Sequence, residues 1–586
     1  MIKLRTYFLL SAILLPQIGA VAQPRPINKE VEVKRPYDPS VVDAQKIWFD
    51  PTINVDSLKA KDPIRYSVMP QSISSDFGLN PIASATFIEN NRGNSGLGYV
   101  RVGAGYLPST LADFYISNNN ASTVLLGLYA NHRGFWGDIE LDNGNMKKDV
   151  NADNMSNDIG AFIKVPFSSA ILSINADYSG KRFRFYGYDP SWFAGSQEPY
   201  KKDSVRQTFN LYNINVQVES ATSGGDRFDY GGGFSVQRFT DRFDMGETAF
   251  MGWAMLGKHW DGMHNLSGTI RVANYNRNNK LDNFGSNTLL YVQPSYTYTN
   301  GDFTGKLGLS FVGDQYDGDS DSKVYPALMA SYRLADFFIP SVEIRGDTEV
   351  NSYRKLAYDC NYVRPGLDNS LNYIPVTQKF RNTYRDFVAQ FSVKGDIGSM
   401  ASYNFYVSYS KIDNLPFFIN EDLFTPLPPL FIPLFTNNLG VIYDDGNLVN
   451  VGGELRLDTK SFSLYAKAVY NKYDMDNLTY AVHRPKFETD IRASLKLDNF
   501  IISANLNMGF KRYYIRTLGA QISLVPDYHY HELGDIINLS GSVEYFITDK
   551  FSVFGNINNL LNKKYEVFHQ HRVPGMMLSG GITFRF

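Results

Sequence analysis

Two pairs of histidines, each pair separated by one residue, lie near the end of the chain. His529 and His531 occur in PDYHYHELGD, and His569 and His571 occur in EVFHQHRVPG. In an extended chain, residues two apart point to the same side, so each pair could offer two imidazoles to one ion. Imidazole nitrogen suits zinc, copper and nickel. The spacing therefore predicts either a loop-bound transition metal on these four histidines or ordinary solvated loop side chains.

Other chemistry-bearing patterns are missing from the sequence. It contains no G-x-S-x-G, H-E-x-x-H or phosphate-loop motif. The acidic run YDGDSDSK, residues 316–323, lacks the spacing of a calcium-binding EF-hand and is interpreted as a solvated loop. The net charge of −2 gives no indication of a nucleic-acid partner. We expect no enzyme, no nucleic-acid binding and no cofactor besides the metal considered above.

The first 22 residues have the composition of a secretory signal peptide. A basic start is followed by an apolar stretch at 7–21 and an A-x-A pattern at 20–22, and we expect cleavage after Ala22. Beyond that point no run of 18 apolar residues occurs, as a membrane-spanning helix would need. The single cysteine, Cys360, cannot form an internal disulfide.

The elements that must position the histidines are strands, because apolar and polar residues alternate along most of the chain. In SFSLYAKAVYNKY, every second residue from Phe462 to Tyr470 is apolar or aromatic, and Ser463, Lys467 and Asn471 lie on the other face. This period of two indicates strands with one apolar and one polar face. Many such runs are about twice as long as the soluble average of about 5–6 residues. Tilted strands of about 9–11 residues cross a bilayer.

The connections between these strands alternate between tight and long. Tight turns are predicted at 167–169, 300–302, 334–336, 458–460, 498–499 and 548–550. Long loops are predicted at 136–156, 188–206, 354–382, 414–435, 515–535 and 563–575. Such an arrangement is typical of outer-membrane barrels. We predict an all-β fold, a transmembrane antiparallel β-barrel of about 22 strands over 97–586. Its apolar face would contact outer-membrane lipid of a Gram-negative bacterium, and its last strand would close against the first.

The end of the chain resembles the end of a TonB-dependent receptor barrel. The resemblance rests on Asn559, Leu560, Asn562, Lys563, Lys564 and Tyr565, on Pro574-Gly575, and on the final Phe584-Arg585-Phe586. It covers 97–586 and implies a 22-stranded barrel that takes up a solute across the outer membrane.

The segment before the barrel differs from that family. Residues 23–96 are rich in proline and too short for the family's glycine-rich plug, so we predict a plugless relative with an extended periplasmic or lumenal segment. In KEVEVKR, Val31 and Val33 alternate with charged residues. This stretch resembles a TonB box, a strand that adds to the sheet of a periplasmic partner. The alternative is a simple extended tether.

Two functions remain open from the sequence. The first is solute uptake, with the outer loops as the selective surface. The second is a non-transporting scaffold that binds periplasmic or surface-exposed protein partners. The apolar segment Asn414–Phe435 could narrow the lumen, seat a surface lipoprotein or pack against the barrel's own rim.

Overall fold

The computed structural model describes residues 97–118, 124–190, 205–221, 228–278, 283–316, 318–363, 380–398, 400–420, 438–517 and 528–586. The predicted signal peptide and the extended segment at 23–96 lie outside these residues. Within the described part of the chain, helices of the length and hydropathy needed to cross a membrane do not occur.

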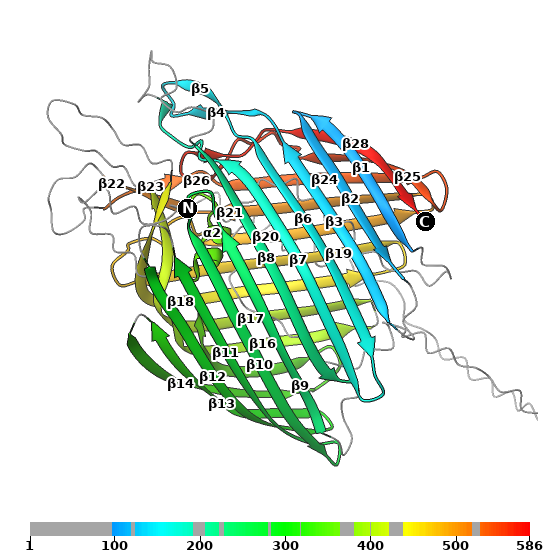
Figure 1. Cartoon of the computed structure of the whole chain (residues 1–586), viewed down its shortest axis with the longest axis vertical. Coiled ribbons are helices and arrows are strands. Elements are labelled where there is room, and N and C mark those ends of the chain that lie inside the picture. The colour runs from blue at the N-terminus through cyan, green and yellow to red at the C-terminus, as the bar shows by residue number, and fades with distance from the viewer. Residues whose placement is uncertain are drawn as a thin grey trace, which may run out of the picture. The chain divides into compact units, whose positions relative to one another are not determined.

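The described residues form an all-β fold, a closed antiparallel barrel of 22 strands (Figure 1). The ring consists of β1 (Gly98–Tyr106), β2 (Ser109–Ser117), β3 (Leu125–Phe135), β6 (Asn154–Pro166), β7 (Ala170–Arg184), β8 (Arg206–Ser220), β9 (Phe228–Thr240), β10 (Gly246–Trp260), β11 (His264–Asn278), β12 (Asn283–Asn300), β13 (Phe303–Tyr316), β14 (Asp319–Tyr332), β15 (Ile339–Glu349), β16 (Thr383–Ile397), β17 (Ala401–Asn420), β18 (Leu439–Asp458), β19 (Phe462–Met475), β20 (Phe487–Leu497), β21 (Phe500–Phe510), β24 (Ile536–Phe546), β25 (Phe551–Asn558) and β28 (Met577–Arg585).

The last strand closes the barrel against the first, as predicted. β1 and β28 pair without a break from Tyr99↔Arg585 to Tyr106↔Leu578. Leu578, Ile582 and Phe584 are exposed on the outside, whereas the Arg585 guanidinium forms an ion pair of 2.7 Å with Glu544. Closure leaves no free strand edge, which explains how the chain can end on an apolar strand.

Each strand separates its side chains onto two chemically different faces. On β11, Leu266 is 54% exposed and Ile270 is 50% exposed. Ser267 and Arg271 alternate with them; Ser267 hydrogen-bonds Ser295 at 3.0 Å, and Arg271 lies over the ring of Tyr291. The same pattern around the ring gives an apolar exterior and a polar lumen. An apolar surface of this extent is far larger than soluble proteins normally expose.

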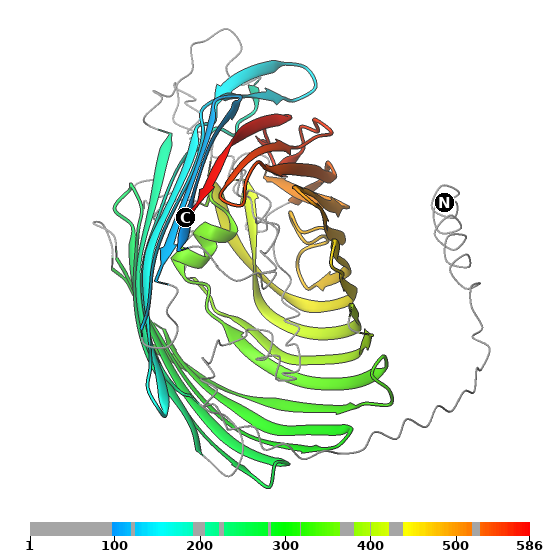
Figure 2. The ribbon, with the colours of Figure 1, turned by 90° about the vertical axis from the view of Figure 1, so that its right-hand side faces the viewer.

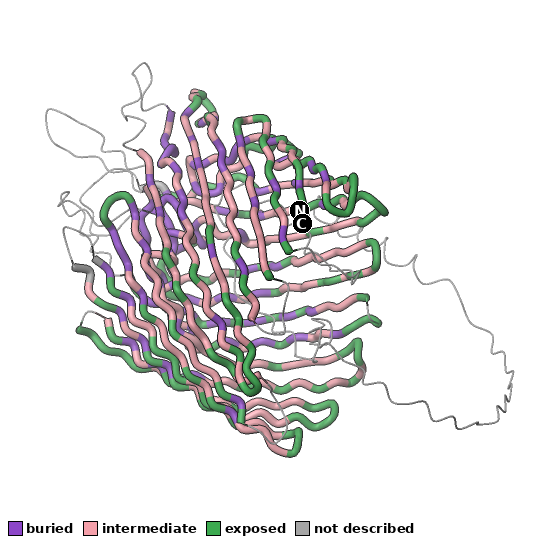
Figure 3. Tube along the Cα trace, turned by 45° about the vertical axis from the view of Figure 1, so that its right-hand side comes forward, coloured by how far each residue is buried: buried purple, intermediate pink, exposed green. Residues whose placement is uncertain are grey.

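The two rims of the barrel differ as the sequence predicted. All six predicted tight turns connect strands at one rim, which we call the short-turn rim. The opposite, long-loop rim carries the described parts of the long connections. Buried residues gather toward the long-loop rim, and the short turns are exposed (Figure 3). Some connections at the long-loop rim are nevertheless short, such as residues 107–108 between β1 and β2.

The long-loop rim contains more regular structure than we predicted. Its connections include one helix and three hairpins: α2 (Tyr353–Asp359), β4 (Asp138–Asp142) with β5 (Lys147–Asn151), β22 (Arg512–Thr517) with β23 (Tyr528–Leu533), and β26 (Glu566–Phe568) with β27 (His571–Arg572). α2 lies on the inner side of the ring of strands (Figure 2), and Leu356 and Ala357 on it are fully buried.

Two predicted loops are partly strand. Asn414–Asn420, predicted to begin an apolar loop, continues β17, because its backbone pairs with β18 up to Asn420↔Leu439. Its apolar side chains Leu415, Phe417 and Ile419 are buried against Leu478, Val482 and Ile515 of neighbouring connections, so this part packs against the barrel's own rim. In the acidic run at 316–323, Asp319 and Asp321 belong to β14 and pair with β13.

Candidate functional site

Connections from widely separated strands meet in one apolar cluster at the long-loop rim. The cluster combines residues that follow β7, β15 and β25, which are the fifth, thirteenth and twenty-first strands of the ring. Among the connections that contribute to the cluster, these three are spread almost evenly around the circumference. A contact among them must extend across the mouth of the barrel rather than along one edge.

Three aromatic side chains form the centre of this contact, and we call Tyr186, Tyr362 and His571 the loop lock. Their relative exposures are 4%, 2% and 1%. The ring centroids of Tyr362 and His571 are 3.7 Å apart in a stacked arrangement. Tyr186 meets both rings edge-on, at 5.8 Å and 5.3 Å. Edge-to-face and offset-stacked pairs are the favoured geometries for such rings.

Hydrogen bonds fix the relative positions of the loop-lock side chains. The Tyr186 hydroxyl donates to the carbonyl of Arg572 at 2.7 Å, and the Tyr362 hydroxyl donates to Tyr186 at 3.4 Å. Lys181 at the end of β7 donates to the Asn361 side chain at 3.1 Å. Gly187 is required for the close approach, because a Cβ there would lie 2.6 Å from the His571 ring.

A buried ion pair fixes the segment that carries Tyr362. Arg277 Nε lies 3.0 Å from Glu247 Oε2, and both side chains are almost fully buried. The same Glu247 oxygen accepts the backbone N–H of Tyr353 at 2.7 Å. The side chain of Ser352 caps α2 by accepting from Lys355. Because Glu247 satisfies both a cation and a helix N–H, its loss would leave two buried partners unsatisfied.

A second buried arginine attaches the hairpin that carries His571. Arg512 on β22 donates to the carbonyls of Gly534, Glu566 and Val567. Burial lowers the pKa of Arg512 to about 10, so it stays charged at neutral pH. This side chain joins the β22–β23 and β26–β27 hairpins through their backbones.

His483 lies buried beside this hairpin. Its Nε2 accepts the backbone N–H of His569 at 3.2 Å, and its Nδ1 lies 2.9 Å from the carbonyl of Phe418. Burial, together with repulsion from Arg512, His569 and His571, holds the pKa of His483 well below its usual range. His483 is therefore neutral, with Nδ1 as donor and Nε2 as acceptor.

The four histidines predicted to bind a metal lie at the same rim but in different surroundings. His531 and His569 both contact the ring of Tyr514, with centroids 5.2 Å and 3.6 Å away. His571 belongs to the loop lock, and His529 is exposed on β23 opposite Arg516. Across the described residues, no group of three or more His, Cys, Asp or Glu side chains is arranged to hold a metal ion. The metal site stays a prediction.

The loop lock was not predicted from the sequence. Tyr186 is separated from Tyr362 by 176 residues, and neither belongs to a motif. One local signal was present: Phe183, Phe185, Tyr186 and Tyr188 follow each other closely where the connection predicted at 188–206 begins. Such aromatic density in a loop indicates burial or a partner. Val31 and Val33, the predicted partner-binding residues, lie outside the described residues.

Comparison with known proteins gives similarity in structure and none in sequence. No protein-family model and no curated protein matches the chain. The siderophore receptor PirA from Acinetobacter baumannii is 10% identical with a TM-score of 0.61, over 83% of this chain and 80% of PirA. The FrpB iron transporter from Neisseria meningitidis is 12% identical with a TM-score of 0.60, over 84% of this chain and 82% of FrpB.

A third solved structure is similar to the same degree. The ferric-catecholate import receptor Fiu from E. coli K12 is 9% identical with a TM-score of 0.59, over 84% of this chain and 82% of Fiu. At these identities the likeness concerns the fold. The chain shares the large β-barrel architecture of these receptors and transporters.

Proposed function

We propose that this protein spans the outer membrane of a Gram-negative bacterium and takes up a solute through its barrel, with the loop lock as a gate at the outer mouth. The apolar exterior suits lipid, and the polar lumen suits water. Barrels of 22 strands are wide enough that they need a plug or another closure. The similarity in fold to iron and siderophore receptors supports an uptake role in general.

The observation that carries this proposal is the burial of Tyr186, Tyr362 and His571. These residues belong to connections from three well-separated parts of the ring. A barrel that served only as a scaffold for other proteins would not need its loops to meet across the lumen. A barrel that passes solute must stop other solutes from leaking, and a contact that can open and close meets that need.

The N-terminal segment is proposed to engage a periplasmic partner. Val31 and Val33 would add a short strand to the sheet edge of a TonB-like protein, and residues 23–96 would form an extended segment in place of a plug. This part of the proposal rests on the sequence alone. Replacing both valines with proline should abolish capture of such a partner. Unchanged capture would mean that the segment is a simple extended tether.

We also carry forward the metal site as a proposal. Zinc or nickel titrated calorimetrically into the purified barrel should bind, and His531→Ala with His569→Ala should remove that binding. A control variant that combines His132→Ala on β3 with His264→Ala on β11 should keep it. Binding that is absent, or equal in both variants, would show that these histidines hold no metal ion.

Planar-bilayer recording of the purified protein tests the proposed uptake function. We expect wild type to be mostly closed with brief large openings, and loosening the loop lock should make openings frequent. A barrel that stays silent in every variant and copurifies with a periplasmic protein or surface lipoprotein would instead be a scaffold.

A further inference from the structure

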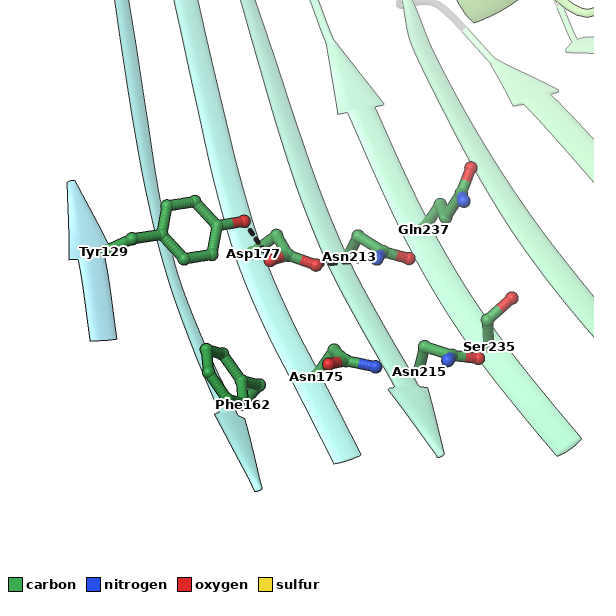
Figure 4. Close-up of a pocket in the computed structure, with 8 residues that line it drawn as sticks. All are labelled: Tyr129, Phe162, Asn175, Asp177, Asn213, Asn215, Ser235 and Gln237. Carbon is green, nitrogen blue, oxygen red and sulfur yellow. Dashed lines mark hydrogen bonds between the residues drawn. The ribbon is translucent and has the colours of Figure 1, made fainter. Parts of the chain in front are cut away.

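A polar hollow of about 320 Å³ lies on the inner wall of the barrel, away from the loop lock. It is formed on β3, β6, β7, β8 and β9, and Figure 4 shows its side chains lying side by side across these strands. The lining residues are Tyr129, Phe162, Asn175, Asp177, Asn213, Asn215, Ser235 and Gln237.

Strand register arranges these side chains in two neighbouring rows. One row runs Tyr129, Gly160, Asp177, Asn213 and Gln237, and the next runs Gly127, Phe162, Asn175, Asn215 and Ser235. Paired residues of an antiparallel ladder point to the same face. This face is the lumen, because the alternate residues Tyr212 and Ile214 are exposed on the apolar exterior.

Two glycines allow the aromatic rings to lie flat on the wall. A Cβ at Gly160 would overlap the ring of Tyr129, and a Cβ at Gly127 would overlap the ring of Phe162. Each ring therefore lies across the neighbouring strand, with one face against the wall and the other toward the lumen. An aromatic face carries partial negative charge and attracts the weakly positive hydrogens of C–H bonds.

The amide side chains beside the rings have unused hydrogen-bonding capacity. Asp177 accepts from the Tyr129 hydroxyl at 2.5 Å and from Asn213 Nδ2 at 3.1 Å, which fixes these two side chains. Among the described residues, Asn213 Oδ1 and Gln237 Oε1 are buried and have no hydrogen-bond partner. Both oxygens are closed to solvent, so a ligand in the hollow would meet the amides of Asn175 and Asn215, which also line it.

The same composition continues one row further along the wall. Register places Gln217 opposite Gly233, which is opposite Trp253. A Cβ at Gly233 would lie 2.5 Å from the indole Nε1, so this ring also lies over a glycine. Flat aromatic rings next to amides thus recur over successive strands, and a ligand longer than one ring could follow them.

We propose that this hollow is a binding subsite for neutral carbohydrate. A sugar ring presents C–H groups on its faces, which fit Tyr129 and Phe162, and hydroxyl groups at its edge, which fit the amides. Asp177 is the only charged residue among those lining the hollow, and its negative charge disfavours anionic ligands. A few fixed polar groups beside apolar surface are what orient a small ligand. This inference rests on the proposed uptake function and names its substrate class.

Calorimetry on the purified full-length protein tests the inference, in a detergent without a sugar headgroup. The probes are maltohexaose, cellohexaose and mannohexaose, with hexagalacturonate as the anionic counterpart. We expect at least one neutral probe to bind and the anionic probe to bind at least about tenfold more weakly. The double variant Asn213→Ala and Asn215→Ala should weaken binding about tenfold or more, since each lost hydrogen bond to a ligand is substantial when buried.

A matched control lies on another part of the inner wall. Asn505 and Asn507 on β21 are an inward-facing amide pair whose side chains hydrogen-bond each other at 3.3 Å and do not line the hollow. Asn505→Ala with Asn507→Ala should leave sugar binding unchanged. Failure of all three neutral probes to bind, preference for the anionic probe, or equal effects of the two double variants would overturn the inference. Conductance measurements stay separate: a conducting barrel without sugar binding sinks only this inference, and a sugar-binding barrel that never conducts sinks only the uptake function.

Discussion

Removing the Tyr362 side chain should open the mouth of the barrel. Tyr362 is 2% exposed and its ring contacts Phe183, Tyr186, Phe568 and His571. The Tyr362 ring therefore contacts residues of β7 and of the connection that follows it, and also residues of the connection that follows β25. The substitution Tyr362→Ala removes all of these contacts without altering a ring strand.

The expected size of the effect follows from burial. Truncating a buried aromatic side chain to alanine costs about 3–5 kcal/mol. If the low end, about 3 kcal/mol, falls on the closed arrangement alone, the open–closed equilibrium shifts by roughly two orders of magnitude. Tyr362→Phe keeps the ring and loses one hydroxyl contact, so its effect should be less than about tenfold.

Single-channel recording in planar bilayers measures this shift as open probability. The matched control is Tyr325→Ala, because Tyr325 is 1% exposed on the inner wall at β14 and donates to or accepts from Thr348 at 2.8 Å. It loses a similar buried ring but touches none of the loop lock. Equal open probabilities in wild type and Tyr362→Ala, or equal increases in both alanine variants, would refute the gate.

Three further outcomes follow from the same contacts. Gly187→Val should also open the mouth, because the valine side chain would collide with the His571 ring. An open probability equal to that of wild type would contradict this. Acidification from about pH 7.5 to about pH 5.5 should loosen the loops around His483. The pKa of His483 is depressed in the folded protein. Below about pH 6.5, the His483 imidazole therefore takes up a proton when the loop is open and stays neutral while the loop is closed. Thermal unfolding should then show a smaller acid-induced loss of stability in His483→Gln than in wild type, and an equal loss would count against this reasoning. Glu247→Ala should cost about 3–5 kcal/mol, since it strands the buried charge of Arg277; limited proteolysis near α2 should accelerate, and no change in cleavage rate would show that the pair is dispensable.

The ring of strands could be predicted from the sequence because its determinants are local. A period of two appears within ten residues, and tight turns such as 498–499 are defined by the residues in them. The β1–β28 closure also follows, because an apolar final strand needs a partner. The sequence predicts a loop at Asn414–Asn420, because its run of apolar residues masks the alternation that the rest of β17 shows.

The loop lock and the wall hollow depend on barrel closure and on register. Tyr186, Tyr362 and His571 become neighbours only because the ring brings the fifth, thirteenth and twenty-first strands to one mouth. Gly160 lies under Tyr129 only in the register that β3 and β6 adopt. Neither contact corresponds to a recognisable spacing in the sequence. The sequence therefore predicts the strands of the barrel but not these contacts between side chains.

Labelling of the chain's single cysteine tests the closed mouth most directly. Cys360 is 0% exposed next to Tyr362, and burial raises the pKa of its thiol well above its usual range. In intact cells, a bulky membrane-impermeant maleimide should leave wild type unlabelled and should label Tyr362→Ala readily. Rapid labelling of wild type, or continued protection in the variant, would contradict a gate made by these loops.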